Sequence, residues 1–147
     1  MKRHSRSAQD LHQLSQDMAT TATRLVRWLP TDGFNLSLAA VRILGRLSDR
    51  GPTRISDIAV LEHSSQPTIT NHVKRLEAAG LVHRDPDPAD ARAWLIDLTT
   101  EGREQLAHLR HLLGTNVEPY LDRLSNRDLQ ALESGLIVLK QIIGTKD

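Results

Sequence analysis

Apolar residues recur every three or four positions along most of the chain, which is the spacing of one face of an α-helix. In the first part of the chain this stripe consists of Leu11, Leu14, Met18, Ala22 and Leu25. We therefore predict an amphipathic helix over residues 7–28, ended by the turn-forming residues 30–33. A second helix is predicted over residues 36–50, with Asn35 or Ser37 as its N-cap.

Two shorter helices follow, separated by the polar turn His63-Ser64-Ser65. The first is expected over residues 53–62. The second begins at Gln66-Pro67, because a proline is well placed in the first turn of a helix. Its buried face is predicted to consist of Ile69, Val73 and Leu76, at positions i, i+4 and i+7. Gly80 is expected to end this helix as a C′ glycine.

Two strands are predicted next, over residues 81–84 and 93–98, and together they form a β-hairpin. The segment between them, residues 85–92, alternates aspartates with prolines before it reaches Arg92. We expect this segment to be a tight loop without regular structure.

Two further helices complete the pattern. The longer one is capped by Thr99 or Thr100, and a bend is expected near Pro119. Its stripe is Leu106, Leu109, Leu113, Val117, Leu121 and Leu124. The last helix follows a capping-box variant at Ser125 to Asp128. Its stripe is Leu129, Leu132, Leu136, Leu139 and Ile143.

Two short helices joined by a serine-containing turn and followed by a hairpin are typical of a winged helix-turn-helix. The predicted fold class is therefore mainly α with a small β-hairpin wing, the winged helix-turn-helix being flanked by terminal helices. We assign residues 1–34 and 100–147 to dimerisation and residues 35–99 to DNA binding, all within one intertwined domain. A leucine stripe left exposed in the last helix would mark an interface, unless the helix packs on its own domain.

The second helix of such a pair fits the major groove of DNA. At 100° per residue, the side opposite Ile69 presents Pro67, Thr68, Asn71 and Arg75, with Thr70 and Lys74 beside them. Asparagine pairs with adenine, and arginine or lysine pairs with guanine or phosphate. Ser65 and Gln66 lie at the helix N-terminus, where free N–H groups favour a phosphate. An ordinary solvated helix face has the same composition, so the surrounding fold is what favours DNA binding.

The hairpin offers a second contact. Arg92 lies at its base, where a guanidinium can enter a narrow minor groove. Asp90 is placed to orient that side chain by a bidentate ion pair. The alternative is a hairpin latch with no role in DNA binding.

Composition narrows the function classes. The chain has 147 residues and no cysteine, which excludes disulfide scaffolds, thiolate metal sites and thiol-based sensing. Residues 51–98 carry 5 basic and 7 acidic groups, so any DNA binding relies on a few placed cations. No apolar run approaches the roughly 20 residues that span a bilayer. Without a secretory signal either, we expect a cytoplasmic protein with no membrane partner. Nucleotide-binding and hydrolase motifs are absent, so no enzyme is expected.

An ordered set of motifs runs through the middle of the chain: Ile55–Ala59, Gln66–Thr70, Leu76–Arg84, Asp90–Arg92 and Leu98-Thr99. This set resembles the MarR family of bacterial transcription regulators. The resemblance implies a homodimer that reads a pseudo-palindromic operator in double-stranded DNA. The major-groove residues that it implies are Ser65, Gln66, Thr68, Thr70, Asn71 and Lys74. It also implies Arg92 in the minor groove and phosphate contacts from Ser37, Thr53 and Arg54. Ala91 departs from the family, where a second arginine is common.

The same resemblance implies a small aromatic or phenolic effector between the dimerisation helices and the DNA-binding lobe. The candidate lining residues are Met18, Trp28, Phe34 and His108, each of which is otherwise an ordinary core or surface residue. No cofactor is expected. His108 and His111 share a helix face, but a zinc site needs three or four convergent ligands, so solvent-facing histidines are favoured.

Two functional hypotheses remain at this stage. The first is a ligand-responsive, sequence-specific regulator, in most cases a repressor. The second is a winged-helix module that binds proteins and not DNA, which the acidic middle segment supports. The salt dependence of binding to a duplex separates the two.

Overall fold

The computed structural model describes residues 7–29 and 35–144. The chain divides into two compact units, Met1–Asp32 and Gly33–Asp147. In the first unit, α1 (Ala8–Trp28) confirms the predicted amphipathic helix. Its start is fixed by a reciprocal capping box. The Ser7 hydroxyl accepts from the backbone N–H of Asp10 at 3.1 Å, and the Asp10 carboxylate accepts from the backbone N–H of Ser7 at 3.0 Å.

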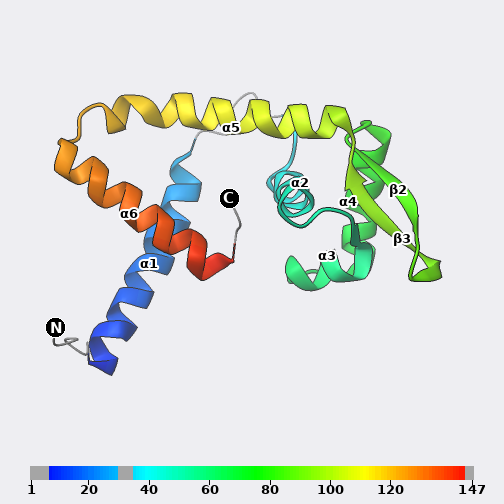
Figure 1. Cartoon of the computed structure of the whole chain (residues 1–147), viewed down its shortest axis with the longest axis horizontal. Helices are drawn as coiled ribbons and strands as arrows, with labels where there is room; N and C mark the ends of the chain where they lie inside the picture. Colours follow the sequence, from blue (N-terminus) through cyan, green and yellow to red (C-terminus); the bar gives the residue numbers. More distant parts are fainter. Residues whose placement is uncertain (1–6, 30–34, 145–147) are drawn as a thin grey trace. The chain divides into compact units, whose positions relative to one another are not determined.

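The second unit carries the winged helix-turn-helix, and the predicted fold class is confirmed. Its elements are α2 (Leu38–Arg50), β1 (Thr53–Arg54), α3 (Ile55–Leu61), α4 (Gln66–Ala78), β2 (Val82–Asp87), β3 (Asp90–Leu98), α5 (Thr100–Leu121) and α6 (Asn126–Ile143). Figure 1 shows α2 to α4 and the sheet gathered around the N-terminal half of α5.

The sheet corrects two predictions. Residues 53–54 begin a strand, not a helix, because β1 pairs with β3 in an antiparallel sheet of order β1-β3-β2. Residues 85–92 are not an irregular loop, since the hairpin strands continue to Asp87 and Asp90 with a shift in register between Pro86 and Asp87. A bulge of this kind lets a strand containing proline keep its pairing close to the tip.

The core lies between α2, α3, α4, the sheet and the first half of α5. It is built from residues that each element turns inward, as the helical and strand periods require. Ile69, Val73 and Leu76 of α4 are buried, which confirms the predicted inner face. The other buried apolar residues are Ala40, Ile43, Leu44, Leu47, Ile58, Ala59, Leu81, Val82, Ile96, Leu98, Leu106 and Leu109.

Local signals fix both ends of α4. Ser65 is its N-cap, and its hydroxyl accepts from the backbone N–H of Thr68 at 3.3 Å. Gly80 adopts a φ of +73° just past the helix end, which is the left-handed geometry that glycine provides without a steric cost. The turn before α4 also contains a left-handed residue, His63, with a φ of +50°.

The joint between the hairpin and α5 is tightly constrained. Thr99 caps α5 by accepting from the backbone N–H of Gly102, and its hydroxyl also donates to the Gly80 carbonyl at 2.6 Å. A side chain at position 102 would place its Cβ 2.0 Å from the Leu81 carbonyl oxygen. Glycine is therefore needed at position 102, because the α5 backbone passes close against the backbone of Leu81, the residue before β2.

After Leu109, the described part of α5 and α6 adds no buried residue to the core. Pro119 lies within α5 and does not end it. The Ser125 hydroxyl caps α6, but Asp128 accepts from that hydroxyl and not from the backbone, so the expected capping box is only half formed. None of the residues of α6 is buried. Within the described ranges, no helix is long and apolar enough to cross a bilayer.

Candidate nucleic-acid interface

The outer face of α4 is polar and open to solvent. The exposed residues here are Gln66 in the first turn, and Pro67, Thr68, Asn71, Lys74 and Arg75, while Thr70 is half-buried. A shallow cavity of about 440 Å³ opens on this face and is lined by Gln66, Pro67, Thr70 and Asn71. The structure thus brings the candidate major-groove residues together on one surface.

Three hydroxyl-bearing candidates in this region already hold hydrogen bonds. The Ser65 and Thr68 hydroxyls lie 2.7 Å apart, and the Thr70 hydroxyl donates to the Gln66 carbonyl at 2.8 Å. These bonds stabilise the first turn of α4. Each hydroxyl keeps some capacity to accept or donate, but its orientation is set by the helix.

Five other candidates have side chains without a hydrogen bond or ion pair to any residue in the described part of the chain. These five residues are Gln66, Asn71, Lys74, Arg75 and Arg92. Four of them are on α4, and Arg92 is on β3. Long polar side chains with no internal partner are available to an external one, and their types are those that contact bases and phosphates.

The three candidates for phosphate contact are all engaged within the protein. Ser37 caps α2, its hydroxyl accepting from the backbone N–H of Ala40 at 3.2 Å. The Thr53 hydroxyl donates to the Gly51 carbonyl at 2.8 Å. The Arg54 guanidinium binds Asp87, with Nε and Nη2 both 2.5 Å from the same carboxylate oxygen.

The wing differs from the prediction in one respect. Asp90 does not orient the Arg92 guanidinium by an ion pair; its carboxylate accepts from the backbone N–H of Arg92 at 3.0 Å. The aspartate therefore fixes the backbone of the tip, as short acidic side chains commonly do in turns. The Arg92 side chain is exposed.

Asp87, near the tip of the hairpin, is 7% exposed. The backbone N–H of Ala89 donates to its second oxygen at 2.8 Å. This bond, followed by the Arg54 guanidinium, holds the pKa of Asp87 below its ordinary value, against the opposing effect of burial. Hydrogen bonding to Asp87, together with its charge, in turn raises the pKa of Arg54.

Sequence reasoning missed a second buried carboxylate. Glu62, 7% exposed, follows α3 and receives two arginines from α2: Arg42 Nε at 2.7 Å and Arg46 Nε at 2.9 Å. This cluster ties α2 to the turn that leads into α4. The signal was present, because Glu62 falls on the apolar side of the short helix, where a carboxylate needs a cationic partner.

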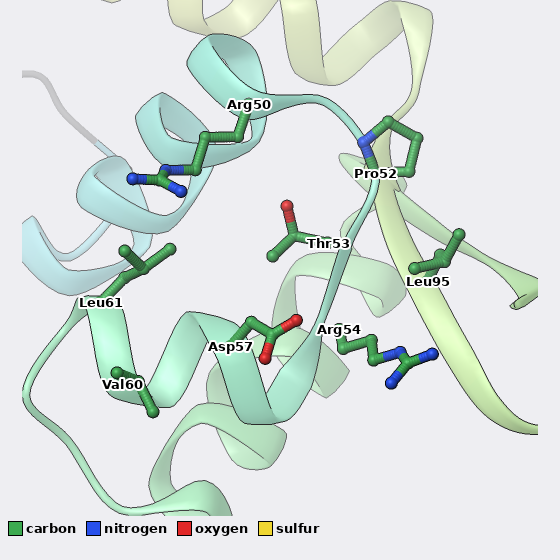
Figure 2. A pocket seen from close by; sticks show the side chains of 8 residues that line it. All are labelled: Arg50, Pro52, Thr53, Arg54, Asp57, Val60, Leu61 and Leu95. Atoms are coloured by element: carbon green, nitrogen blue, oxygen red, sulfur yellow. The ribbon is translucent and has the colours of Figure 1, made fainter. Parts of the chain in front are cut away.

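A further cavity of about 440 Å³ lies between the end of α2, β1, α3 and β3. Figure 2 shows that Arg50 and Arg54 point in opposite directions from it. Its apolar wall consists of Pro52, Val60, Leu61 and Leu95. The Arg54 guanidinium points toward its ion-pair partner Asp87. The guanidinium groups of Arg50 and Arg54 therefore do not converge on one binding site in this cavity.

The candidate effector residues are not brought together within one unit. Met18 and Trp28 are on α1 in the first unit, and His108 is exposed on α5 in the second. Phe34 lies outside the described residues. Among the residues that are described, no group of three or more metal-ligating side chains is found, so His108 and His111 have no third ligand there.

Two comparisons with known proteins bear on the identity of the chain. The profile of the MarR family matches residues 36–94, from just before α2 into β3. The transcriptional regulator HosA of Escherichia coli O111:H- is 30% identical over 119 residues, which cover 80% of this chain and 84% of HosA. The chain belongs to the MarR family. As a MarR-family member, it is a transcriptional regulator.

Solved structures share the fold of this MarR-family chain. The transcriptional regulator Tm0710 from Thermotoga maritima is 27% identical with a TM-score of 0.68, over 92% of this chain and 95% of that one. A mutant of MepR from S. aureus, bound to an oligodeoxyribonucleotide, is 21% identical with a TM-score of 0.56. That alignment covers 90% of this chain and 94% of MepR.

Proposed function

We propose that this MarR-family chain acts in the cytoplasm as a homodimeric repressor that binds a pseudo-palindromic site in double-stranded DNA. In this proposal α4 reads the major groove and Arg92 enters the minor groove. A small aromatic or phenolic effector changes the affinity for DNA.

The observation that carries the proposal is the division of α4 into two faces. Its apolar side is fully buried in the core, while Asn71, Lys74 and Arg75 on the other side and Gln66 in the first turn have no internal partner in the described ranges. A helix held so firmly by one side presents the other in a fixed orientation. Preorganised side chains of these types are suited to base edges and phosphates.

The wing supports a second contact. Arg92 follows a tip whose backbone is fixed by Asp90, and its exposed guanidinium has no partner among the described residues. A narrow minor groove concentrates negative potential, which favours an inserted arginine. That the MepR mutant with the same fold is bound to an oligodeoxyribonucleotide agrees with this role.

The proposed dimer uses α1, the C-terminal half of α5 and α6. The exposed apolar residues of α6 include Leu132, Leu136, Leu139 and Ile143. A contiguous apolar stripe of this kind is typical of a subunit interface. A two-fold axis would then place two copies of α4 about one helical turn, or 10 base pairs, apart on the duplex.

The effector part of the proposal needs only a ligand with different affinities for two geometries of the dimer. Met18, Trp28, Phe34 and His108 are its proposed contacts. The family resemblance supports this part.

One observation favours the alternative, a module that binds proteins and not DNA. The exposed carboxylates of Asp85 and Asp90 lie on the hairpin, where they would repel phosphates. Arg84 is neutralised by Glu77 at 2.9 Å, which further reduces the positive charge near the wing.

Selection of bound sequences from a pool of random duplexes tests the proposal. We expect one pseudo-palindromic site to be enriched, and its affinity to fall steeply with salt in proportion to the phosphates neutralised. An absence of duplex binding at low salt would overturn DNA binding and leave the alternative.

Two matched substitutions on α4 test how the site is read. Asn71→Ala should cost about 1–3 kcal/mol on the selected duplex and relax base preference at one position in each half-site. Lys74→Ala, the control, should weaken all duplexes alike and reduce the salt slope by about 1. Equal losses on every sequence for Asn71→Ala would make Asn71 a backbone contact.

A further inference from the structure

One ion pair joins the first strand of the sheet to the tip of the wing. Arg54 is on β1 at one edge, and Asp87 ends β2 at the other edge, with β3 between them. The two residues are 33 positions apart in the chain. Their contact therefore spans the full width of the sheet.

The strand register explains how Arg54 reaches so far. Arg54 is paired with Leu95, which is itself paired with Asp85 on the far strand. These three residues form one row across the sheet. Asp87 lies two residues further toward the tip, past the register shift that follows Pro86, and its carboxylate meets the Arg54 guanidinium directly.

The Asp87 carboxylate has partners on both oxygens. One oxygen accepts from two nitrogens of Arg54, and the other accepts from the backbone N–H of Ala89 in the turn. The Asp87 side chain is 6% exposed, whereas that of Arg54 is 38% exposed. Loss of the guanidinium would leave a buried carboxylate without its cation, which folded proteins strongly disfavour.

The tip held in this way leads directly to Arg92. Asp87 fixes the backbone at Ala89, and Asp90 fixes the backbone at Arg92. Two consecutive side chain–backbone bonds thus connect the ion pair to the residue proposed for the minor groove. A displacement of the tip would therefore move that guanidinium, and a contact in the groove depends on how well its side chain is held in place.

We propose that Arg54 and Asp87 are positioning residues, which hold the wing so that Arg92 meets the minor groove. This inference rests on the proposed function. It replaces the expectation that Arg54 contacts phosphate, since the guanidinium is already bound to a carboxylate within the protein. Arg54 therefore affects DNA binding indirectly. It holds Asp87, Asp87 fixes the backbone of the tip, and the tip places Arg92.

Simple electrostatics makes the opposite prediction for one substitution. Asp87→Asn removes a negative charge from a surface that faces phosphates, so affinity for DNA should rise if charge alone matters. Under the proposal, affinity falls, because the neutral amide holds Arg54 less strongly and the tip loses its anchor. The sign of the effect therefore separates the two.

The experiment measures affinity for the duplex that the wild-type protein selects from a random pool. Asp87→Asn and Arg92→Ala should each weaken binding about tenfold, and adding Asp87→Asn to Arg92→Ala should cause little further loss. Asp85→Asn is the matched control, since it removes an exposed carboxylate from the same strand. The control should bind as tightly as the wild type or more tightly.

A second pair of variants keeps the test independent of how well Asp87→Asn folds. Arg54→Lys retains the charge but cannot place two nitrogens on one oxygen. The proposal expects Arg54→Lys to lose most of the affinity that Arg54→Ala loses, with the salt slope unchanged in both. A phosphate contact expects Arg54→Lys to bind well and Arg54→Ala to lower the salt slope by about 1.

The positioning role is wrong if Asp87→Asn binds as well as the wild type while Arg92→Ala binds weakly. It is also wrong if the losses from Asp87→Asn and Arg92→Ala simply add. Failure of the wild-type protein to bind any duplex at low salt is a separate outcome, which would overturn the proposed function and this inference together.

Discussion

Two leucine-rich helices of this chain, α2 and α6, differ in how much of their apolar face is buried. The 13-residue α2 buries Ala40, Ile43, Leu44 and Leu47, whereas the 18-residue α6 buries none of its residues. Both are amphipathic, both are capped by serine, and both end at a glycine with positive φ. Local sequence therefore makes the two helices, but it does not decide what covers them. The apolar face of α2 is covered by the rest of the winged helix. For the apolar face of α6, we propose that a second copy of the chain covers it.

The largest effect is expected from charging the stripe of α6. The double variant Leu136→Asp, Leu139→Asp should weaken self-association by about 3–6 kcal/mol. A two-fold interface holds four of these leucines, and each is already about half-buried in the single chain, so each would gain about half of the roughly 1.5–3 kcal/mol that full burial is worth. Sedimentation equilibrium measures the change directly. Affinity for the selected duplex should fall with it, since each monomer then holds a single half-site.

Val60→Asp is the matched control for that variant. Val60 is 73% exposed on α3, so it is a comparable apolar surface residue outside the proposed interface. Its substitution should leave the association constant unchanged. If the double variant remains as dimeric as the wild type, the apolar stripe of α6 is not the dimer interface, and a second copy of the chain does not cover it.

A smaller effect is expected from opening a cavity under α2. Leu44 is fully buried, so Leu44→Ala should lower the free energy of unfolding by about 2–5 kcal/mol. Leu38→Ala, on the same helix but 55% exposed, should change it by less than about 0.5 kcal/mol. Denaturant titrations at one fixed protein concentration are needed, because association contributes to the stability of a dimer. Equal losses for the two variants would contradict the burial described for α2.

The smallest effect is expected from acid, and it concerns the buried carboxylate of Asp87. The pKa of Asp87 is lowered below 3.8 in the folded chain, so its carboxylate adds stability at pH values above 3.8. This contribution should be constant from pH 7 to about pH 5 and should be lost as the pH falls through the folded-state pKa. The difference in unfolding free energy between the wild type and Asp87→Asn, measured from pH 7 to below pH 3.8, should therefore be constant at first and then shrink in acid. Growth of the difference at low pH would contradict the described ion pair.

Most of the fold could be predicted because its signals are local. The inner face of α4 follows from the spacing of Ile69, Val73 and Leu76, and its end from Gly80. The strand at Thr53–Arg54 could not be predicted in this way. Two residues are too few for a period, and β1 exists because β3, some 40 positions later, supplies its partner.

The wing shows the same limit at the candidate site. The alternating Asp-Pro pattern predicts a loop, yet Asp87 is buried and both strands reach the tip. Arg54, which is distant in sequence, and the backbone of Ala89 provide the partners that make this burial favourable. Similarly, the spacing puts Glu62 on the apolar side of its short helix, but its two arginines come from α2, 16 and 20 positions away in the chain. Exposed side chains such as Asn71 need no distant partner, so the outer face of α4 was accessible to sequence reasoning.

The glycine at the beginning of α5 has a mechanical consequence. Because Gly102 brings the α5 backbone against the Leu81 carbonyl and Thr99 ties the same turn to Gly80, the wing and α5 have little freedom to pivot about their joint. In the proposed dimer α5 then works as a lever arm: a tilt imposed at its far end is transmitted to α4 as whole-body rotation. In the proposed mechanism, an effector that tilts α5 changes the separation of the two copies of α4 and leaves the internal geometry of each winged helix intact.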